Sequence, residues 1–98
     1  MKRLRLDSEA RSELLHEAQY FEAERPGRGR KFRENVKQVF SRIKAYPQRG
    51  KPDEAGTRRM RIKEFDFSVV YREEATEIVV YVIRPDSKQP GYWMSRLK

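Results

Sequence analysis

Apolar residues of the first quarter of the chain recur first at strand spacing and then at helix spacing. Leu4 and Leu6 alternate with charged neighbours over residues 2–6, which predicts a short strand. Either Asp7 or Ser8 can cap a helix, because the side-chain oxygen of each can accept a backbone N–H bond. The apolar positions that follow lie four, four and three residues apart at Ala10, Leu14, Ala18 and Phe21. This spacing predicts a helix that ends before Pro26 and Gly27.

A second helix is predicted over about residues 30–45. Its apolar side chains fall on one face, at Phe32, Val36, Val39, Phe40 and Ile43. The short loop between the two helices contains glycine, so the pair should form an antiparallel helical hairpin.

Three strand-like segments follow a loop that holds Pro47, Gly50, Pro52 and Gly56. They span residues 58–63, 67–72 and 77–84, and the short connections between them predict an antiparallel meander. In the first segment Met60 and Ile62 point one way, while Arg59, Arg61 and Lys63 point the other.

The last segment is apolar on both faces. Strict alternation puts Ile78, Val80 and Val82 on one face and Val79, Tyr81 and Ile83 on the other. Such a strand is usually central and covered on both sides. The helical hairpin can cover one face, but only a short tail with Tyr92, Trp93 and Met94 remains for the other. The pattern therefore predicts a partly apolar, arginine-rimmed concave face that is open to a partner.

These elements define one α+β domain over residues 1–98. It has a short N-terminal strand, a helical hairpin, a three-stranded antiparallel meander and a short C-terminal helix. We expect the core to contain Leu14, Ala18, Phe32, Val36, Val39, Phe40, Met60, Ile62, Val69 and Val80.

Charge is concentrated in the middle of the chain. The net charge is +8, and residues 25–63 hold fourteen of the 23 basic residues but only three acidic ones. Such a concentration can attract nucleic acid, an acidic protein or a membrane surface. The chain has no cysteine and no apolar stretch long enough to cross a bilayer. We therefore expect a cytoplasmic protein without disulfides or a membrane-spanning segment. We also expect neither membrane association nor a small-molecule ligand.

The sequence offers little material for cofactor chemistry. The single histidine, His16, has no cysteine or second histidine to share a metal, so neither a metal site nor a cofactor is expected. The segment Arg25 to Lys31 could be a DNA minor-groove hook, but a helix–helix junction already explains its proline and glycines.

The basic row Arg59, Arg61 and Lys63 has two interpretations. Strand geometry spaces these cations about 7 Å apart, close to the repeat of an extended phosphate backbone. Together with the further cations Arg84 and Lys88 and the rings of Tyr92 and Trp93, the row could bind single-stranded RNA. Alternatively, it is a solvated face beside two aromatic residues that close the core.

The order of elements and several motifs resemble the RelE/ParE superfamily of toxins from type II toxin–antitoxin systems, also called the plasmid-stabilisation family. The fragments that carry the resemblance are Arg25-Pro26-Gly27, Tyr46-Pro47 with Gly50, Arg59-Met60-Arg61, the run from Phe65 to Arg72, and Pro90-Gly91-Tyr92-Trp93.

The resemblance implies a cognate antitoxin and one of two targets. RelE-like members cut messenger RNA on the ribosome without a metal, and ParE-like members poison DNA gyrase. Carried over by position, the RNA-cutting residues would be Arg59, Arg61, Lys88 and Tyr92. The arginine that this branch has on its second meander strand is replaced by Ser68. Members of the superfamily that end in Pro-Gly-Tyr-Trp often carry a histidine and arginines just before that motif. In this chain those positions hold Pro85, Ser87 and Gln89.

These departures favour a ParE-like growth inhibitor that is not an enzyme. The alternatives are a metal-independent, RelE-like mRNA endonuclease and a non-toxic remnant that only binds a partner. In each case the residues expected to contact the target or the antitoxin are Arg59, Arg61, Lys63, Arg84, Lys88, Tyr92, Trp93 and Arg96.

Overall fold

The computed structural model describes residues 1–87 and 91–97. Along the chain it has β1 (Arg3–Leu6), α1 (Ser8–Glu24), α2 (Arg28–Ala45), β2 (Lys51–Pro52), β3 (Arg58–Ile62), β4 (Phe67–Glu73) and β5 (Glu77–Pro85), with short 3-10 turns η1 at Glu54–Gly56 and η2 at Met94–Arg96. The predicted α+β fold and order of elements are confirmed. The two-residue strand β2 lies in a segment predicted to be loop.

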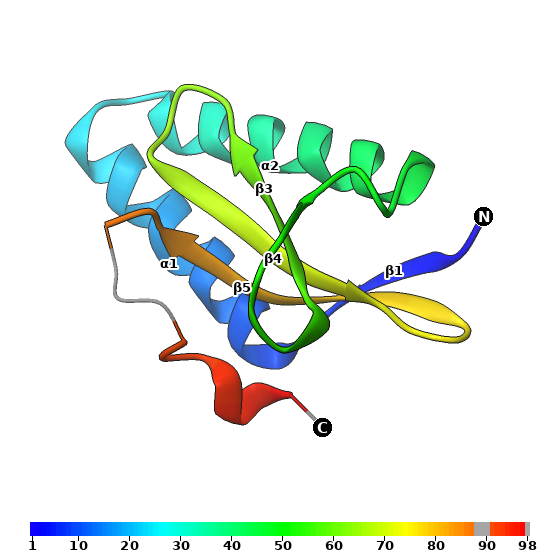
Figure 1. The fold of residues 1–98 in the computed structure, drawn as a ribbon. Coiled ribbons are helices and arrows are strands. Elements are labelled where there is room, and N and C mark those ends of the chain that lie inside the picture. The colour runs from blue at the N-terminus through cyan, green and yellow to red at the C-terminus, as the bar shows by residue number, and fades with distance from the viewer. Residues whose placement is uncertain (88–90, 98) are drawn as a thin grey trace.

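The five strands form one sheet in the order β1-β5-β4-β3-β2. The pairs β2–β3, β3–β4 and β4–β5 are antiparallel, which confirms the predicted meander, whereas β1 runs parallel to β5. Both helices lie on one side of the sheet, and the C-terminal tail lies on the other side (Figure 1). We call these sides the helix face and the tail face. In the part of the chain that is described, neither helix is apolar enough over its length to span a bilayer.

The loop between the helices is held by Glu22, near the end of α1. Its two carboxylate oxygens accept hydrogen bonds from the backbone N–H groups of Gly27 and Gly29, at 3.0 and 3.1 Å. Gly27 has φ +88, and a side chain on Gly29 would collide with the carbonyl oxygen of Ala18. The glycines predicted either for a hairpin junction or for a DNA hook are thus explained by the junction.

The helix face carries the larger core. Four aromatic rings form its centre, with neighbouring centroids 4.9–5.8 Å apart: Phe21, Phe32, Phe65 and Phe67. Of the predicted core residues, Leu14, Phe40 and Met60 are only partly buried, and the others are buried. The turn between β3 and β4 is fastened to this core by Asn35, whose buried amide donates to the carbonyl of Lys63 at 2.8 Å.

A β-bulge in β5 corrects the predicted assignment of its faces. Val70 pairs with Val82, but the next residue of β4, Tyr71, pairs with Val80, so Tyr81 is the extra residue. Because of this extra residue, the alternation shifts by one position beyond Tyr81. Val82 therefore joins the tail face and Ile83 the helix face.

The apolar part of the tail face is closed, contrary to the prediction of an open concave surface. Trp93 covers Val70, Val79, Tyr81 and Val82, and all five side chains are buried. One large ring, with the partly buried Leu97 beside it, is enough here because this cluster contains only four side chains of the sheet.

Candidate functional site

The tail face is hollowed at its β2–β3 edge. Four cationic residues and two acidic ones line this open hollow of about 590 Å³, which we call the cationic hollow: Arg49, Lys51, Arg59, Arg61, Asp66 and Asp86. Two of the residues predicted to bind the target, Arg59 and Arg61, thus lie side by side in a concave site.

A buried tyrosine positions the segment that forms one wall of the hollow. The hydroxyl of Tyr71 donates to the carbonyl of Pro47 at 2.7 Å and accepts from the N–H of Gly50 at 3.0 Å. Gly50 lies so close to the Tyr71 ring that a side chain would collide with the hydroxyl. Arg58 also donates to the Gly50 carbonyl at 2.9 Å. These bonds fix the start of β2, and the close approach of the Tyr71 ring explains why residue 50 is a glycine.

Two like charges lie opposite each other on the neighbouring strands β2 and β3, which border the hollow. Lys51 of β2 lies directly opposite Arg59 of β3 in the antiparallel register. Opposed like charges destabilise a strand pair. Among the described residues, neither side chain makes an ion pair with a carboxylate. An anionic group placed between them would relieve this repulsion.

Arg61, by contrast, is already paired inside the molecule. Its guanidinium lies 3.3 Å from Asp66 and 3.5 Å from Asp86. The hydroxyl of Ser68, which lies opposite Arg61 in the register, donates to Asp86 at 2.6 Å. Ser68 is fully buried. Position 68, where the resemblance leads one to expect an arginine in an RNA-cutting member, is therefore filled by a small side chain bonded to a carboxylate.

Three of the predicted binding residues are largely buried or paired within the fold. Arg84 and Trp93 are 3% and 1% exposed. Arg96 forms a two-bond ion pair with Glu13 of α1, both bonds 3.0 Å long, and its Nε lies 3.3 Å from Glu9. Trp93 and Arg96 thus attach the tail to the rest of the fold, and the buried Arg84 and Trp93 expose little surface.

The Arg96–Glu13 pair also protects the edge of β5 that extends beyond β1. Arg96 donates to the carbonyl of the bulged residue Tyr81 at 3.0 Å, and the N–H of Ile83 donates to Glu13 at 3.0 Å. Burial lowers the pKa of Arg96, but the hydrogen bond to Glu13 and the negative charges of Glu13 and Glu9 together outweigh it and leave that pKa above its usual value. Both ends of the pair therefore replace backbone hydrogen bonds that a neighbouring strand would make.

The remaining predicted residues differ in accessibility. Lys63 and Tyr92 are exposed, Arg59 is half-buried, and Lys88 lies outside the described residues. Partial burial raises the pKa of the Tyr92 hydroxyl. A phenol with a raised pKa is a poor proton donor at neutral pH.

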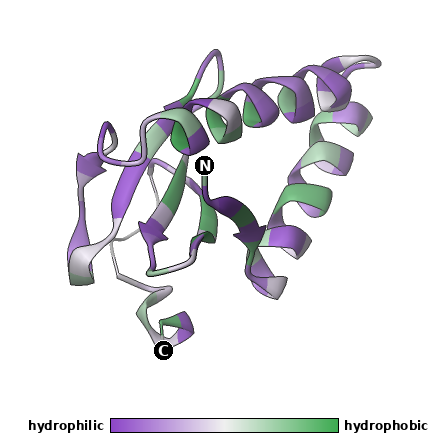
Figure 2. Ribbon diagram, turned by 90° about the vertical axis from the view of Figure 1, so that its right-hand side faces the viewer, coloured by the Kyte–Doolittle hydropathy of each residue, from purple (hydrophilic) through white to green (hydrophobic). Residues whose placement is uncertain are grey.

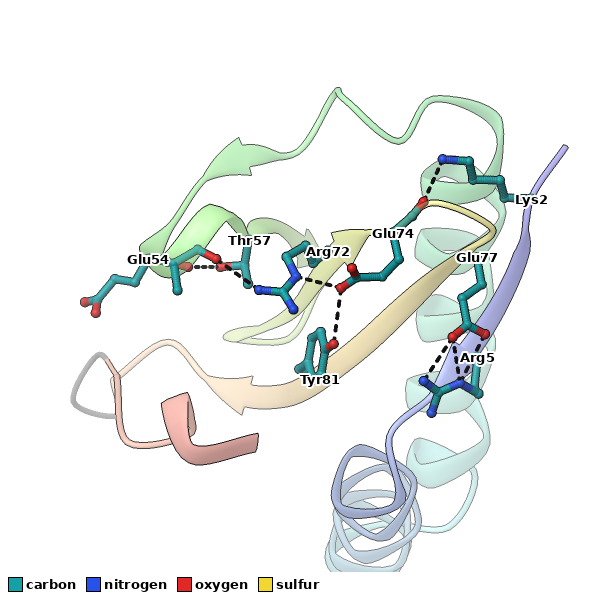
Figure 3. Close-up of polar contacts among 9 residues, drawn as sticks. Lys2, Arg5, Glu54, Thr57, Arg72, Glu74, Glu77 and Tyr81 are labelled. Atoms are coloured by element: carbon teal, nitrogen blue, oxygen red, sulfur yellow. Dashed lines mark hydrogen bonds and ion pairs between the residues drawn. The ribbon is translucent and has the colours of Figure 1, made fainter. Parts of the chain in front are cut away.

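A second charged group lies near the β4–β5 turn (Figure 3). Glu74 accepts hydrogen bonds from Arg72 at 2.6 Å and from the hydroxyl of Tyr81 at 3.3 Å. Arg72 also donates to the carbonyl of Ala55, which ties η1 to the sheet, and its guanidinium lies over the Tyr81 ring. This end of the tail face thus has its charges satisfied internally.

Sequence reasoning missed the acidic members of the site and one of its walls. Asp66 and Asp86 are 20 residues apart in the chain and meet only because β4 and β5 pair, with the N–H of Asp86 bonded to the Asp66 carbonyl at 2.8 Å. Arg49 and Lys51 lie in a segment interpreted as loop. Within the described residues, no three potential metal ligands of the His, Cys, Asp and Glu types come together.

A helical hairpin on one face of a small mixed sheet, with a cationic hollow on the other, places the chain among small α+β domains. Residues 4–90 match the family described as ParE toxin of type II toxin-antitoxin system, parDE. The chain belongs to this family.

The fold is also similar to that of a solved structure titled "Chromosomal ParDE TA system from P. aeruginosa". The TM-score is 0.77 at 20% sequence identity, with 87% of this chain and 96% of that chain covered. At this identity the likeness concerns the fold. A search of curated protein sequences gives no match.

Proposed function

We propose that this chain inhibits growth in the cytoplasm by poisoning DNA gyrase, in the ParE manner, and that a cognate antitoxin neutralises it. The observation that carries the choice of target is the state of Arg61. By the resemblance, Arg61 corresponds to one of the cations that the RNA-cutting branch uses. Here its guanidinium forms ion pairs with Asp66 and Asp86.

Cleavage of RNA without a metal would require cations that stabilise a developing phosphorane and an acid that protonates the leaving oxygen. The buried Ser68 contributes no charge, and the two carboxylates beside Arg61 would repel a phosphate. Tyr92, with its raised pKa, is a weak acid for the second task. These features support a toxin that acts by binding.

The antitoxin would place an acidic segment in the cationic hollow. Lys51 and Arg59 repel each other across β2 and β3 and lack a carboxylate partner among the described residues. Met60 also lines the hollow and offers an apolar contact. A disordered acidic segment that folds on binding could bury a large surface in this way.

The choice of target can be tested with purified components. The protein should block supercoiling of relaxed plasmid by gyrase, or trap cleaved DNA, and should leave messenger RNA on ribosomes intact. Tyr92→Ala should weaken the effect on gyrase, since Tyr92 is the exposed aromatic side chain of the tail. Tyr20→Ala, which removes an exposed ring from α1, is the matched control. Cleavage of ribosome-bound message that is abolished in Arg61→Ala would show that the protein is a nuclease instead.

The antitoxin site can be tested by co-expression with the neighbouring open reading frames. One of them should restore growth and raise the thermal midpoint of the toxin. A Lys51→Gln, Arg59→Gln double variant should remain toxic but need more antitoxin for rescue. A Lys37→Gln, Lys44→Gln variant has the same net charge and should be rescued normally. Equal loss of rescue in both variants would mean that overall charge, and not the hollow, attracts the antitoxin.

A further inference from the structure

The outer surface of α2 carries a second concentration of positive charge, separate from the cationic hollow. The helix has seven basic residues and a single acidic one, Glu34. Its inner positions Phe32, Val36, Val39 and Ile43 are buried, so the cations point outward. Helix α2 lies on the side of the molecule opposite the C-terminal tail, and the hydropathy colouring alternates along it (Figures 1 and 2).

The cations form two rows along the helix. At about 100° per residue, Arg30, Arg33, Lys37 and Lys44 fall within an arc of about 60°, and the row is about 21 Å long. Lys31 and Arg42 form a second row, about 140° further round the helix axis. We call the exposed strip between the rows the α2 ridge, and its residues are Glu34, Gln38, Ser41 and Ala45.

Few of these cations are neutralised. Arg30 pairs with Glu34 at 3.4 Å, and Lys31 approaches Glu64 at 3.8 Å. Arg33, Lys37 and Lys44 make no ion pair within the described residues. The row therefore keeps most of its positive potential for an external anion.

We propose that this face of α2 binds duplex DNA, with the α2 ridge directed into a groove and the two rows of cations directed at the phosphates on either side. An α-helix is about 10–12 Å across with its side chains, and the major groove of B-DNA is about 12 Å wide. Cations on both flanks of one helix match the two phosphate backbones that border such a groove.

The composition of the surface favours a duplex over the other anionic partners. Protein interfaces are anchored by exposed aromatic and large apolar side chains. Single strands need exposed aromatic rings on which bases stack. The exposed large apolar side chains of the described residues lie at Met1, Leu15, Tyr20, Tyr46, Tyr92 and Met94, all outside α2. A polar, strongly cationic surface is typical of protein–DNA interfaces.

The test is the binding of the purified protein to a fluorescent mixed-sequence duplex of about 20 base pairs, two turns of B-form helix. An Arg33→Gln, Lys37→Gln, Lys44→Gln variant should bind roughly tenfold or more weakly at low salt. The slope of log affinity against log salt should fall by about 0.9 for each phosphate that the variant no longer neutralises. Glutamine retains good helix propensity, so the urea midpoint should change little.

The matched control removes the same charge from exposed arginines outside α2, as Arg3→Gln, Arg11→Gln, Arg25→Gln. It should keep most of the affinity and the original slope. An equal loss in this control, absence of duplex binding, or tighter binding of single strands than of the duplex would each overturn the proposal. Displacement of the duplex by poly-glutamate as readily as by unlabelled duplex of equal charge would assign the face to an acidic protein. Neither gyrase nor antitoxin is present, so failure here leaves the proposed function intact.

Discussion

The two faces of the sheet are covered by very different amounts of chain. On the helix face, two helices of 17 and 18 residues bury a continuous apolar core that includes four phenylalanine rings. On the tail face, one tryptophan and the partly buried Leu97 cover four side chains of the sheet. The rest of the tail face is occupied by charged residues paired with one another or lining the cationic hollow.

This difference separates stability from recognition. Hydrophobic burial is roughly proportional to the apolar area removed from water, so most of the folding free energy should come from the helix face. The tail face can then hold like charges opposite each other, as Lys51 and Arg59 do, without unfolding the domain. The following substitutions measure that division, beginning with the largest expected effect.

Removing a central ring from the helix face should destabilise the domain most. Phe32 is fully buried and contacts three other phenylalanine rings. Phe32→Ala should lower the free energy of unfolding by about 3–5 kcal/mol, as measured by urea denaturation. Phe40→Ala, at a partly buried position of the same helix, should have a clearly smaller effect. Equal losses would show that the aromatic cluster is not the centre of the core.

Removing the ring of the tail face should have a smaller effect. Trp93→Ala should lower the free energy of unfolding by about 1–3 kcal/mol, because the tail can detach while the helix face stays folded. Trp93→Phe keeps one aromatic ring and removes a buried indole N–H that has no hydrogen-bond partner among the described residues. It should therefore destabilise the fold less than Trp93→Ala, by the cost of the smaller cavity alone. Equal losses in the two variants would show that a phenyl ring cannot close the tail face in place of the indole.

Breaking the ion pair between Arg96 and Glu13, which attaches the tail to α1, should lower the free energy of unfolding somewhat less than removing the Trp93 ring. Arg96→Gln leaves the partly buried Glu13 without its two-bond partner and frees the Tyr81 carbonyl. Between the values for exposed and buried pairs, a loss of about 1–2 kcal/mol is expected. Amide hydrogen exchange should rise at residues 81–84 and remain unchanged in α2. Arg11→Gln, an exposed arginine on α1, is the control.

The smallest effect concerns pH and the helix junction. Backbone hydrogen bonds from Gly27, and then from Gly29, lower the pKa of Glu22 below its usual value of 4.5. A lowered pKa means that the carboxylate stabilises the fold above its unfolded pKa and ceases to do so as the pH falls through the folded pKa. Glu22→Gln should therefore flatten the acid side of the stability profile, measured from about pH 7 to about pH 3. Glu17→Gln on the same helix should leave that side of the profile unchanged.

Much of the fold could be predicted because local patterns specify it. Spacings of three and four placed α1 and α2, and glycine with proline marked their junction. Short connections predicted the β3–β4–β5 meander. Each of these signals depends on residues close together in the sequence, where geometry follows directly from backbone periodicity.

Only the tertiary structure decided where distant residues meet. One extra residue at Tyr81 exchanged the faces predicted for Val82 and Ile83, because alternation holds only along an unbroken strand. The pairing of Arg96 with Glu13 joins residues 83 positions apart. Asp86 reaches Arg61 only after β4 and β5 have paired, and Asp66 meets the same arginine from the turn between β3 and β4. The sequence by itself thus determined the elements, the family resemblance and the cations. Which cations are neutralised and which remain available depends on contacts that exist only in the folded chain.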